Sequence, residues 1–121
     1  MLTGSCLCGD IRYTVTATPE GAAACHCSQC RKQSGHYWAA AWVPLSGIEI
    51  TGTPTWYQAS DTARRGFCPR CGSSLFWQKL GGEFIDFSLG SVDGAIGLHL
   101  ARHIHTEDKG DYYVIPESEL G

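Results

Sequence analysis

The stretch F-C-P-R-C-G-S-S-L-F-W, residues 67–77, does most to decide the fold. It places two thiols, Cys68 and Cys71, on either side of a Pro-Arg pair, whose proline presets φ for a tight turn. Gly72 lets the backbone leave that turn with positive φ. Two cysteines arranged in this way can face one metal ion, as in a zinc knuckle. Residues 74–79 are typical of a strand, which argues against a thioredoxin-type redox motif, because that motif opens a helix.

Two further ligands for such a site are available near the N-terminus, in the C-x-C pair Cys6 and Cys8. Residues i and i+2 of an extended segment point to the same side, so both thiols can reach one ion. A disulfide between them would close a very small, strained ring. We therefore predict a structural zinc site of four thiolates, whose binding energy would support a modest core. Two separate cysteine pairs without a shared metal are the alternative.

The other three cysteines, Cys25, Cys27 and Cys30, lie within one segment, C-H-C-S-Q-C. Three protein ligands with one open position are the form expected of a catalytic zinc site, where water or substrate fills the fourth position. Three thiolates make the ion a weaker Lewis acid than three imidazoles would, and they favour a soft sulfur ligand. The expected substrate is therefore a thiol or a thiohemiacetal.

Two alternatives to an open site are left by the sequence. The first is closure by histidine, for which the candidates are His36, His99, His103 and His105. His26 should point away from the cysteines on either side of it. The second is a metal-free group of thiols. Disulfides would require an oxidising compartment, and with seven cysteines they would leave one thiol unpaired.

The residues that follow Cys30 offer a pocket for an acidic thiol such as glutathione. Arg31 and Lys32 could bind its carboxylates, and Ser34 and the Gly35 amide could donate hydrogen bonds to it. A solvated basic face is the ordinary explanation of the first two residues.

Other candidates are interpreted structurally or are given no role. Trp38 is more typical of a core, and the basic pair 64–65 is more typical of a surface. The histidines between residues 99 and 105 sit at strand spacing and receive no acid–base role. Asp86 and Asp93 have no identifiable partner, so no proton-transfer group is assigned.

Alternation of apolar and polar residues predicts an all-β domain of short antiparallel strands with little helix. The expected strands cover residues 10–17, 37–43, 47–51, 55–59, 74–79, 83–89, 98–105 and 112–115, with a helical turn at 27–33 and a loop at 60–65. With 121 residues and no linker, a single domain over residues 1–121 is expected.

The charge balance and hydropathy exclude several classes of partner. The formal charge is −3 and the pI about 5.9, whereas nucleic-acid modules carry a basic stripe. No apolar run approaches the roughly 20 residues of a membrane span, and residues 1–10 lack the form of a signal peptide. We expect a soluble cytoplasmic protein with no nucleic-acid or membrane partner. The oligomeric state is not decided by the sequence.

Four segments in order carry a resemblance to a known family. They read G-S-C-L-C-G-D-I-R-Y at residues 4–13, C-H-C-S-Q-C-R-K-Q-S-G at 25–35, F-C-P-R-C-G-S-S-L-F-W at 67–77 and G-S-V-D at 90–93. Together they resemble the glutathione-dependent formaldehyde-activating enzyme (GFA) family, also called the centromere-protein-V domain.

The resemblance implies a β-tent fold and two Zn²⁺ ions. It divides the ligands as above, with Cys6, Cys8, Cys68 and Cys71 at the structural zinc and Cys25, Cys27 and Cys30 at the functional zinc. It also implies carbon–sulfur lyase activity, in which glutathione and formaldehyde give S-hydroxymethylglutathione. A zinc-stabilised binding or interaction module without catalysis is the alternative function.

Overall fold

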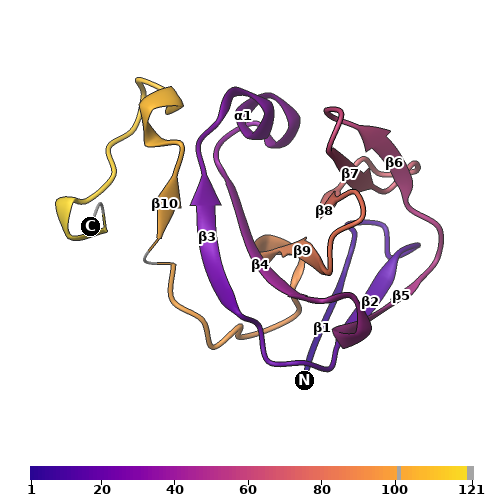
Figure 1. Cartoon of the computed structure of the whole chain (residues 1–121). Helices are drawn as coiled ribbons and strands as arrows, with labels where there is room; N and C mark the ends of the chain where they lie inside the picture. Colours follow the sequence, from indigo (N-terminus) through magenta and orange to yellow (C-terminus); the bar gives the residue numbers. More distant parts are fainter. Residues whose placement is uncertain (101, 120–121) are drawn as a thin grey trace.

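The computed structural model describes residues 1–100 and 102–119, whose strands form two sheets (Figure 1). The smaller sheet has the order β1-β2-β5 and the larger has the order β10-β3-β4-β9-β8-β7-β6. The strands are β1 Leu2–Ser5, β2 Arg12–Val15, β3 Gly21–Cys25, β4 Trp38–Pro44, β5 Ile48–Thr51, β6 Thr55–Gln58, β7 Ala63–Phe67, β8 Ser74–Lys79, β9 Phe84–Ser88 and β10 His103–Ile104. Helix α1 spans Ser28–Ser34, and four 3₁₀ turns span Leu45–Gly47, Leu89–Ser91, Thr106–Asp108 and Glu117–Glu119. The predicted all-β class with little helix is confirmed.

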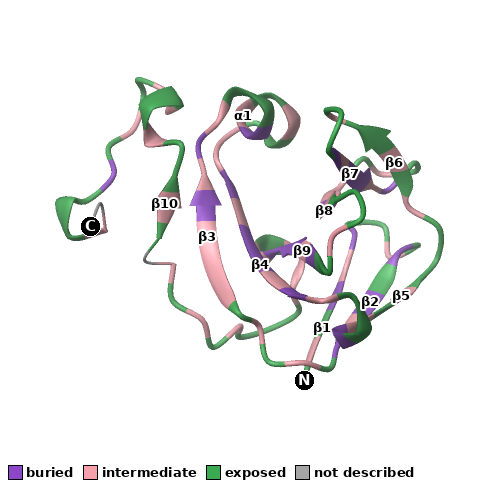
Figure 2. Cartoon of the chain, in the orientation of Figure 1, coloured by how far each residue is buried: buried purple, intermediate pink, exposed green. Residues whose placement is uncertain are grey.

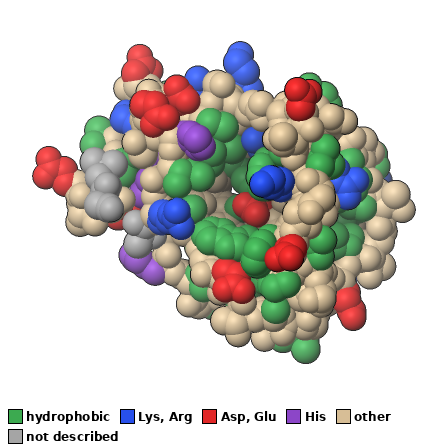
Figure 3. Space-filling model, viewed as in Figure 1, with side chains coloured by type: hydrophobic (Ala, Val, Ile, Leu, Met, Phe, Trp, Pro, Cys, Tyr) green, Lys and Arg blue, Asp and Glu red, His purple; other side chains and the backbone are tan. Residues whose placement is uncertain are grey.

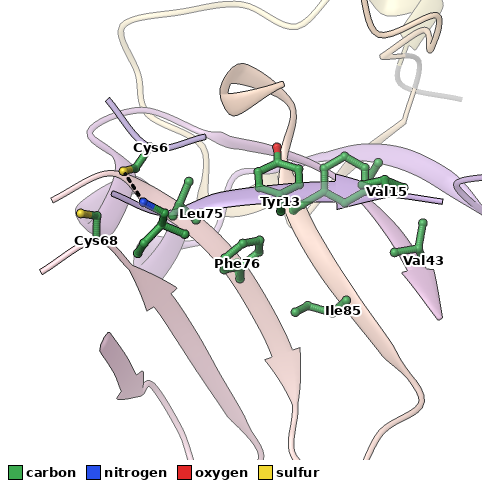
Figure 4. Packing of buried hydrophobic residues seen from close by; sticks show 11 residues of the cluster. Cys6, Tyr13, Val15, Val43, Cys68, Leu75, Phe76 and Ile85 are labelled. Carbon is green, nitrogen blue, oxygen red and sulfur yellow. Dashed lines mark hydrogen bonds between the residues drawn. The ribbon is translucent and has the colours of Figure 1, made fainter. Parts of the chain in front are cut away.

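The main apolar core joins the two sheets (Figures 2 and 4). Tyr13 and Val15 of β2 meet Val43 of β4, Phe76 of β8 and Phe87 of β9, and each of these side chains is at most 2% exposed. Burying a side chain of this size contributes about 1.5–3 kcal/mol. The cluster also contains Cys6 and Cys68, so the four-cysteine group Cys6, Cys8, Cys68 and Cys71 lies at the edge of this core.

Three strands were not predicted, and each departs from the usual strand composition. Strand β1 contains a glycine, and β3 is G-A-A-A-C, although Ala and Gly are depleted in strands. In β3 the small side chains fit because they face the alanines of β4, with Ala23 opposite Ala40 and Ala24 opposite Ala39. Strand β7 falls partly in the predicted loop, yet it is paired on both sides, with β6 and β8. Tertiary pairing therefore overrides local propensity here.

The two strands predicted at the C-terminal end were largely wrong. The strand expected over 98–105 is reduced to His103–Ile104, which pairs parallel with β3. His105 ends it with φ of 54°, and residue 101 lies outside the described residues. The segment 112–115 forms no strand. Its two tyrosines are instead held by side-chain hydrogen bonds to histidines, which require no backbone ladder.

The site is organised by the continuous unit β3–α1–β4 (Figure 1). Strand β3 ends at Cys25, and α1 begins directly after its N-cap, Cys27. Gly35 ends the helix with φ of 90°, so that the chain turns back into β4. Within the described residues, no helix has the length and apolar character needed to cross a membrane.

Candidate metal centres and the adjoining cavity

Four thiols, two from the β1–β2 connection and two from the β7–β8 connection, converge at one point. Their sulfur atoms all lie within 4.8 Å of one another. The Sγ atoms of Cys6 and Cys8 are 3.6 Å apart, and those of Cys8 and Cys68 are 3.7 Å apart. A tetrahedral zinc site with Zn–S of about 2.3 Å has sulfur–sulfur edges of about 3.8 Å. The donor set Cys6, Cys8, Cys68 and Cys71 therefore fits a tetrahedral thiolate-bound metal.

Hydrogen bonds around this group favour the thiolate form that a metal requires. The amides of Ile11 and Cys71 donate to the Sγ atoms of Cys6 and Cys68 over 3.3 and 3.4 Å. The Ser73 hydroxyl, 3.3 Å from Cys71 Sγ, lowers the pKa of that thiol to about 5. The local chain conformation thus favours the thiolate form at Cys71, whereas the neighbouring thiols raise the pKa of Cys8 to about 12.

The remaining three thiols form a second group, at the junction of β3 and α1. Cys25, Cys27 and Cys30 place their sulfur atoms within 4.8 Å of one another. The amide of Cys30 donates to Cys27 Sγ over 3.4 Å, which repeats the geometry of the other C-x-x-C turn. A hydrogen bond from Cys25, reinforced by Arg65, lowers the pKa of Cys30 to about 5. Among residues 1–100 and 102–119, no histidine, cysteine or carboxylate joins this group as a fourth ligand.

The histidines considered as a fourth ligand are mostly engaged elsewhere. His26 is completely buried and points away from the three thiols, with Nδ1 on the Tyr113 hydroxyl and Nε2 2.9 Å from His103 Nδ1. His103 Nε2 in turn lies 3.1 Å from a Glu119 oxygen. His36 Nδ1 lies 2.8 Å from the hydroxyl of Tyr112. The chain Tyr113–His26–His103–Glu119 therefore fastens the C-terminal segment to the back of the thiol group.

His99 and His105 are both exposed. His105 lies outside the group of thiols, with Nδ1 3.7 Å from a Glu107 carboxylate oxygen, and it lines a cavity in front of the thiols.

A cavity of about 520 Å³ opens in front of the three thiols. Besides the cysteines, its walls include Trp38 of β4, Trp77 of β8, Arg65 of β7 and Asp86 of β9. Figure 3 shows a hollow on this face, with acidic atoms at its floor and basic atoms at its rim. A small polar molecule in this cavity would contact sulfur, an arginine, a carboxylate and two indole rings.

Two of these cavity residues were not recognised from the sequence. Arg65, expected on the surface, is only 5% exposed, because its guanidinium group lies against Gln29 and Cys30 of α1. Asp86 had no assigned role, and burial raises its pKa to about 7, with the charge of Cys30 adding to the rise and Arg65 opposing it. The mixed face of the predicted strand over 83–89 was the signal for Asp86. The sequence around Arg65 is typical of a surface loop, and no feature of it indicated that this arginine is buried.

The predicted substrate residues lie around α1 rather than in the cavity. Arg31 Nε donates to the Asp108 carbonyl over 3.2 Å, and Lys32 borders a smaller depression of about 320 Å³ that is also lined by Arg65. The Ser34 hydroxyl donates to the Cys30 carbonyl over 2.7 Å. The Gly35 amide donates to the Arg31 carbonyl over 2.8 Å. These donors of Ser34 and Gly35 are therefore used in hydrogen bonds that end the helix.

Comparisons with known proteins give matches over most of the chain. Residues 1–108 match the sequence family described as glutathione-dependent formaldehyde-activating enzyme. A Halomonas elongata protein named "Putative glutathione-dependent formaldehyde-activating enzyme" is 31% identical over 137 positions, covering 98% of this chain and 83% of that protein. A crystal structure of a Rhodobacter sphaeroides protein superposes with a TM-score of 0.63 at 26% identity, covering 78% of this chain and 91% of that one.

The family match spans nearly the whole chain, and the relative is matched over most of its length. The matched residues 1–108 contain both cysteine groups of this chain. The chain therefore belongs to the glutathione-dependent formaldehyde-activating enzyme family.

Proposed function

We propose that this protein is a zinc-dependent carbon–sulfur lyase that acts in the cytoplasm on a thiol adduct of an aldehyde, such as S-hydroxymethylglutathione. The observation that carries the proposal is the group of three thiols at the wall of a cavity, without a fourth protein ligand among the described residues. Membership of the family supports glutathione as the thiol. The four-thiol group at the core edge is proposed to hold a purely structural zinc ion.

The chemistry of the donor set supports a sulfur substrate. A zinc ion held by three thiolates supplies a position for a fourth, soft ligand such as the sulfur of a thiol. In the cleavage direction, the carbon–sulfur bond breaks and sulfur keeps its electron pair. The hydroxyl group loses its proton, and its oxygen forms the carbonyl of the aldehyde. In the reverse direction the thiolate adds to the carbonyl carbon and the oxygen gains a proton.

The rest of the thiol is proposed to extend from the cavity towards α1. Arg31 and Lys32 lie in the last turn of this helix, and Lys32 shares a depression with Arg65, which also lines the cavity. Carboxylates of glutathione placed along this path would meet these two cations. Ser34 and Gly35 contribute by ending the helix beside this path.

The test is the exchange of ¹³C-formaldehyde with glutathione, followed by NMR on protein that carries two zinc ions per chain. We expect faster exchange than in buffer, and loss of the acceleration in Cys27→Ser. A protein that binds glutathione without accelerating exchange would be a binding module, the alternative function. Equal rates for Cys27→Ser and wild type, with both proteins fully metallated, would contradict a role of the three-thiol site.

A further inference from the structure

The cavity in front of the three thiols contains a polar wall that faces the sulfur atoms. Arg65 lies on β7 and Asp86 on β9 of the larger sheet, with strand β8 between them. Both line the same 520 Å³ cavity as Cys25, Cys27 and Cys30. If a substrate sulfur binds at the three-thiol site, the group attached to that sulfur would therefore face this wall.

Arg65 is buried with donors to spare. Its Nη2 donates to Cys30 Sγ and to Gln29 Oε1, each over 3.4 Å. Its Nε and Nη1 are buried, yet neither has a hydrogen-bond partner within residues 1–100 and 102–119. The indole Nε1 of Trp38, another residue of the cavity wall, is in the same state. Unpaired buried donors are costly, so they indicate a place where an acceptor is missing.

Asp86 provides the complementary group. In β9 it lies opposite Trp42 of β4 and Trp77 of β8, so its carboxylate is framed by indole rings. It makes no ion pair with Arg65 within 4.0 Å in the described part of the chain, although both line one cavity. An acceptor and several donors thus share this space without satisfying one another.

We propose that Arg65 and Asp86 form a recognition site for the hydroxyl group that an aldehyde acquires when it adds to a thiol. A hydroxyl group is donor and acceptor at once. Asp86 accepts its hydrogen, while Arg65, with Trp38 Nε1, donates to its oxygen. In a hemithioacetal this oxygen is two bonds from sulfur, and Arg65 already contacts Cys30 Sγ. The subsite rests on the proposed function and narrows it to adducts that carry a hydroxyl on the carbon next to sulfur.

The subsite predicts discrimination against thioethers. S-methylglutathione has no hydroxyl at this position, so it leaves Arg65 and Asp86 unpaired, whereas S-hydroxymethylglutathione satisfies both. A site built to bind a hydroxyl rejects analogues that lack it much more strongly than an apolar pocket rejects a missing methylene. Asp86→Asn and Arg65→Lys should therefore weaken binding of the hydroxylated adduct and spare the thioether, because Lys keeps the charge but loses the planar fork.

The experiment is isothermal titration of the zinc-loaded protein with three probes, namely glutathione, S-methylglutathione, and glutathione in excess formaldehyde. Formaldehyde alone serves as the blank. We expect Asp86→Asn to weaken the formaldehyde adduct by about 10-fold or more, while the other two probes change by less than about 2-fold. Arg65→Lys, checked for folding by circular dichroism, should show the same pattern. Asp61→Asn, an exposed aspartate outside the cavity, is the matched control.

Two results would overturn the subsite while leaving the proposed function intact. One is an equal loss for all three probes in Asp86→Asn, and the other is no loss for any of them. Failure of the wild-type protein to bind any probe would instead overturn the proposed function, and with it the subsite. The two failures are distinguishable because the first appears only in the variants and the second appears in the unmodified protein.

Discussion

The Nη2 atom of Arg65 lies 3.4 Å from the Sγ atom of Cys30, so a cation from β7 contacts one thiol of the second group. Arg65 and Cys30 are 35 positions apart in the chain. Three thiolates around a Zn²⁺ ion would leave a net charge of −1, which the guanidinium group would offset in a buried site. The pair therefore links helix α1 to strand β7 beside the candidate metal centre.

Replacing Arg65 by Gln should weaken zinc binding at the three-thiol group selectively. Partners of metal ligands typically contribute about 10- to 100-fold to metal affinity, and here the charge is lost as well. Competition with a chromogenic chelator should show one of two zinc ions released earlier than in wild type. Arg64→Gln is the control, because Arg64 stacks on Trp56 and bonds Gln78 instead. Parallel release of both ions in both variants would contradict this role.

Loss of a ligand should have different consequences at the two cysteine groups. Cys68 is fully buried and belongs to the main core. Cys68→Ser should lower the free energy of unfolding by about 3 kcal/mol or more, because binding of a structural zinc ion contributes directly to folding. Cys27→Ser, at a half-buried position beside the cavity, should lower the melting temperature less. Thermal unfolding, together with zinc content per chain, measures both effects. Equal destabilisation by the two substitutions would contradict the division into one structural and one functional site.

Asp86 should make stability fall as the pH rises through neutrality. Burial raises its folded pKa from 3.8 to about 7, so the folded chain holds this proton more tightly than the unfolded chain. The stabilising contribution is therefore complete below pH 3.8 and is lost as the pH passes about 7. Each pKa unit corresponds to about 1.4 kcal/mol.

The uncharged Asp86→Asn should show a smaller decrease in the free energy of unfolding over this interval. Urea titrations at about pH 5 and about pH 8 test this. Asp61→Asn should follow wild type. A wild-type curve that is parallel to that of Asp86→Asn would show that the Asp86 carboxyl titrates normally.

The chain Tyr113–His26–His103–Glu119 should hold the C-terminal segment in place. Tyr113→Phe removes the hydroxyl that pairs with His26 Nδ1 and should cost about 1–3 kcal/mol, because a buried ring nitrogen is left unpaired. Limited proteolysis should then cleave the segment after β10 sooner, and thermal unfolding gives the size of the effect. Tyr57→Phe, at a tyrosine that is 64% exposed, should be neutral. Unchanged cleavage would mean that ring packing alone holds the segment.

The sequence was sufficient for the features that local spacing controls. The turn at Cys68–Gly72, the helical turn after Cys27 and the strands with clear alternation follow from two or three neighbouring residues, and the structure contains them. Thiol spacing also limited the ways in which seven cysteines could be grouped, since C-x-C and C-x-x-C pairs are restricted by backbone geometry. Membership of the family could be read from the same spacing.

Only the tertiary structure decided what surrounds the thiols. The alanine-rich strand β3 exists because β4 offers equally small side chains opposite it, and β7 exists because it is paired on both sides. The assembled sheet and helix α1 bury Arg65 and place it at the wall of the same cavity as Asp86. Burial and the meeting of residues from different strands depend on the whole sheet. The mixed face of the strand over 83–89 could mark Asp86 as unusual, but no local pattern could show that it forms a polar wall with Arg65 facing the thiols.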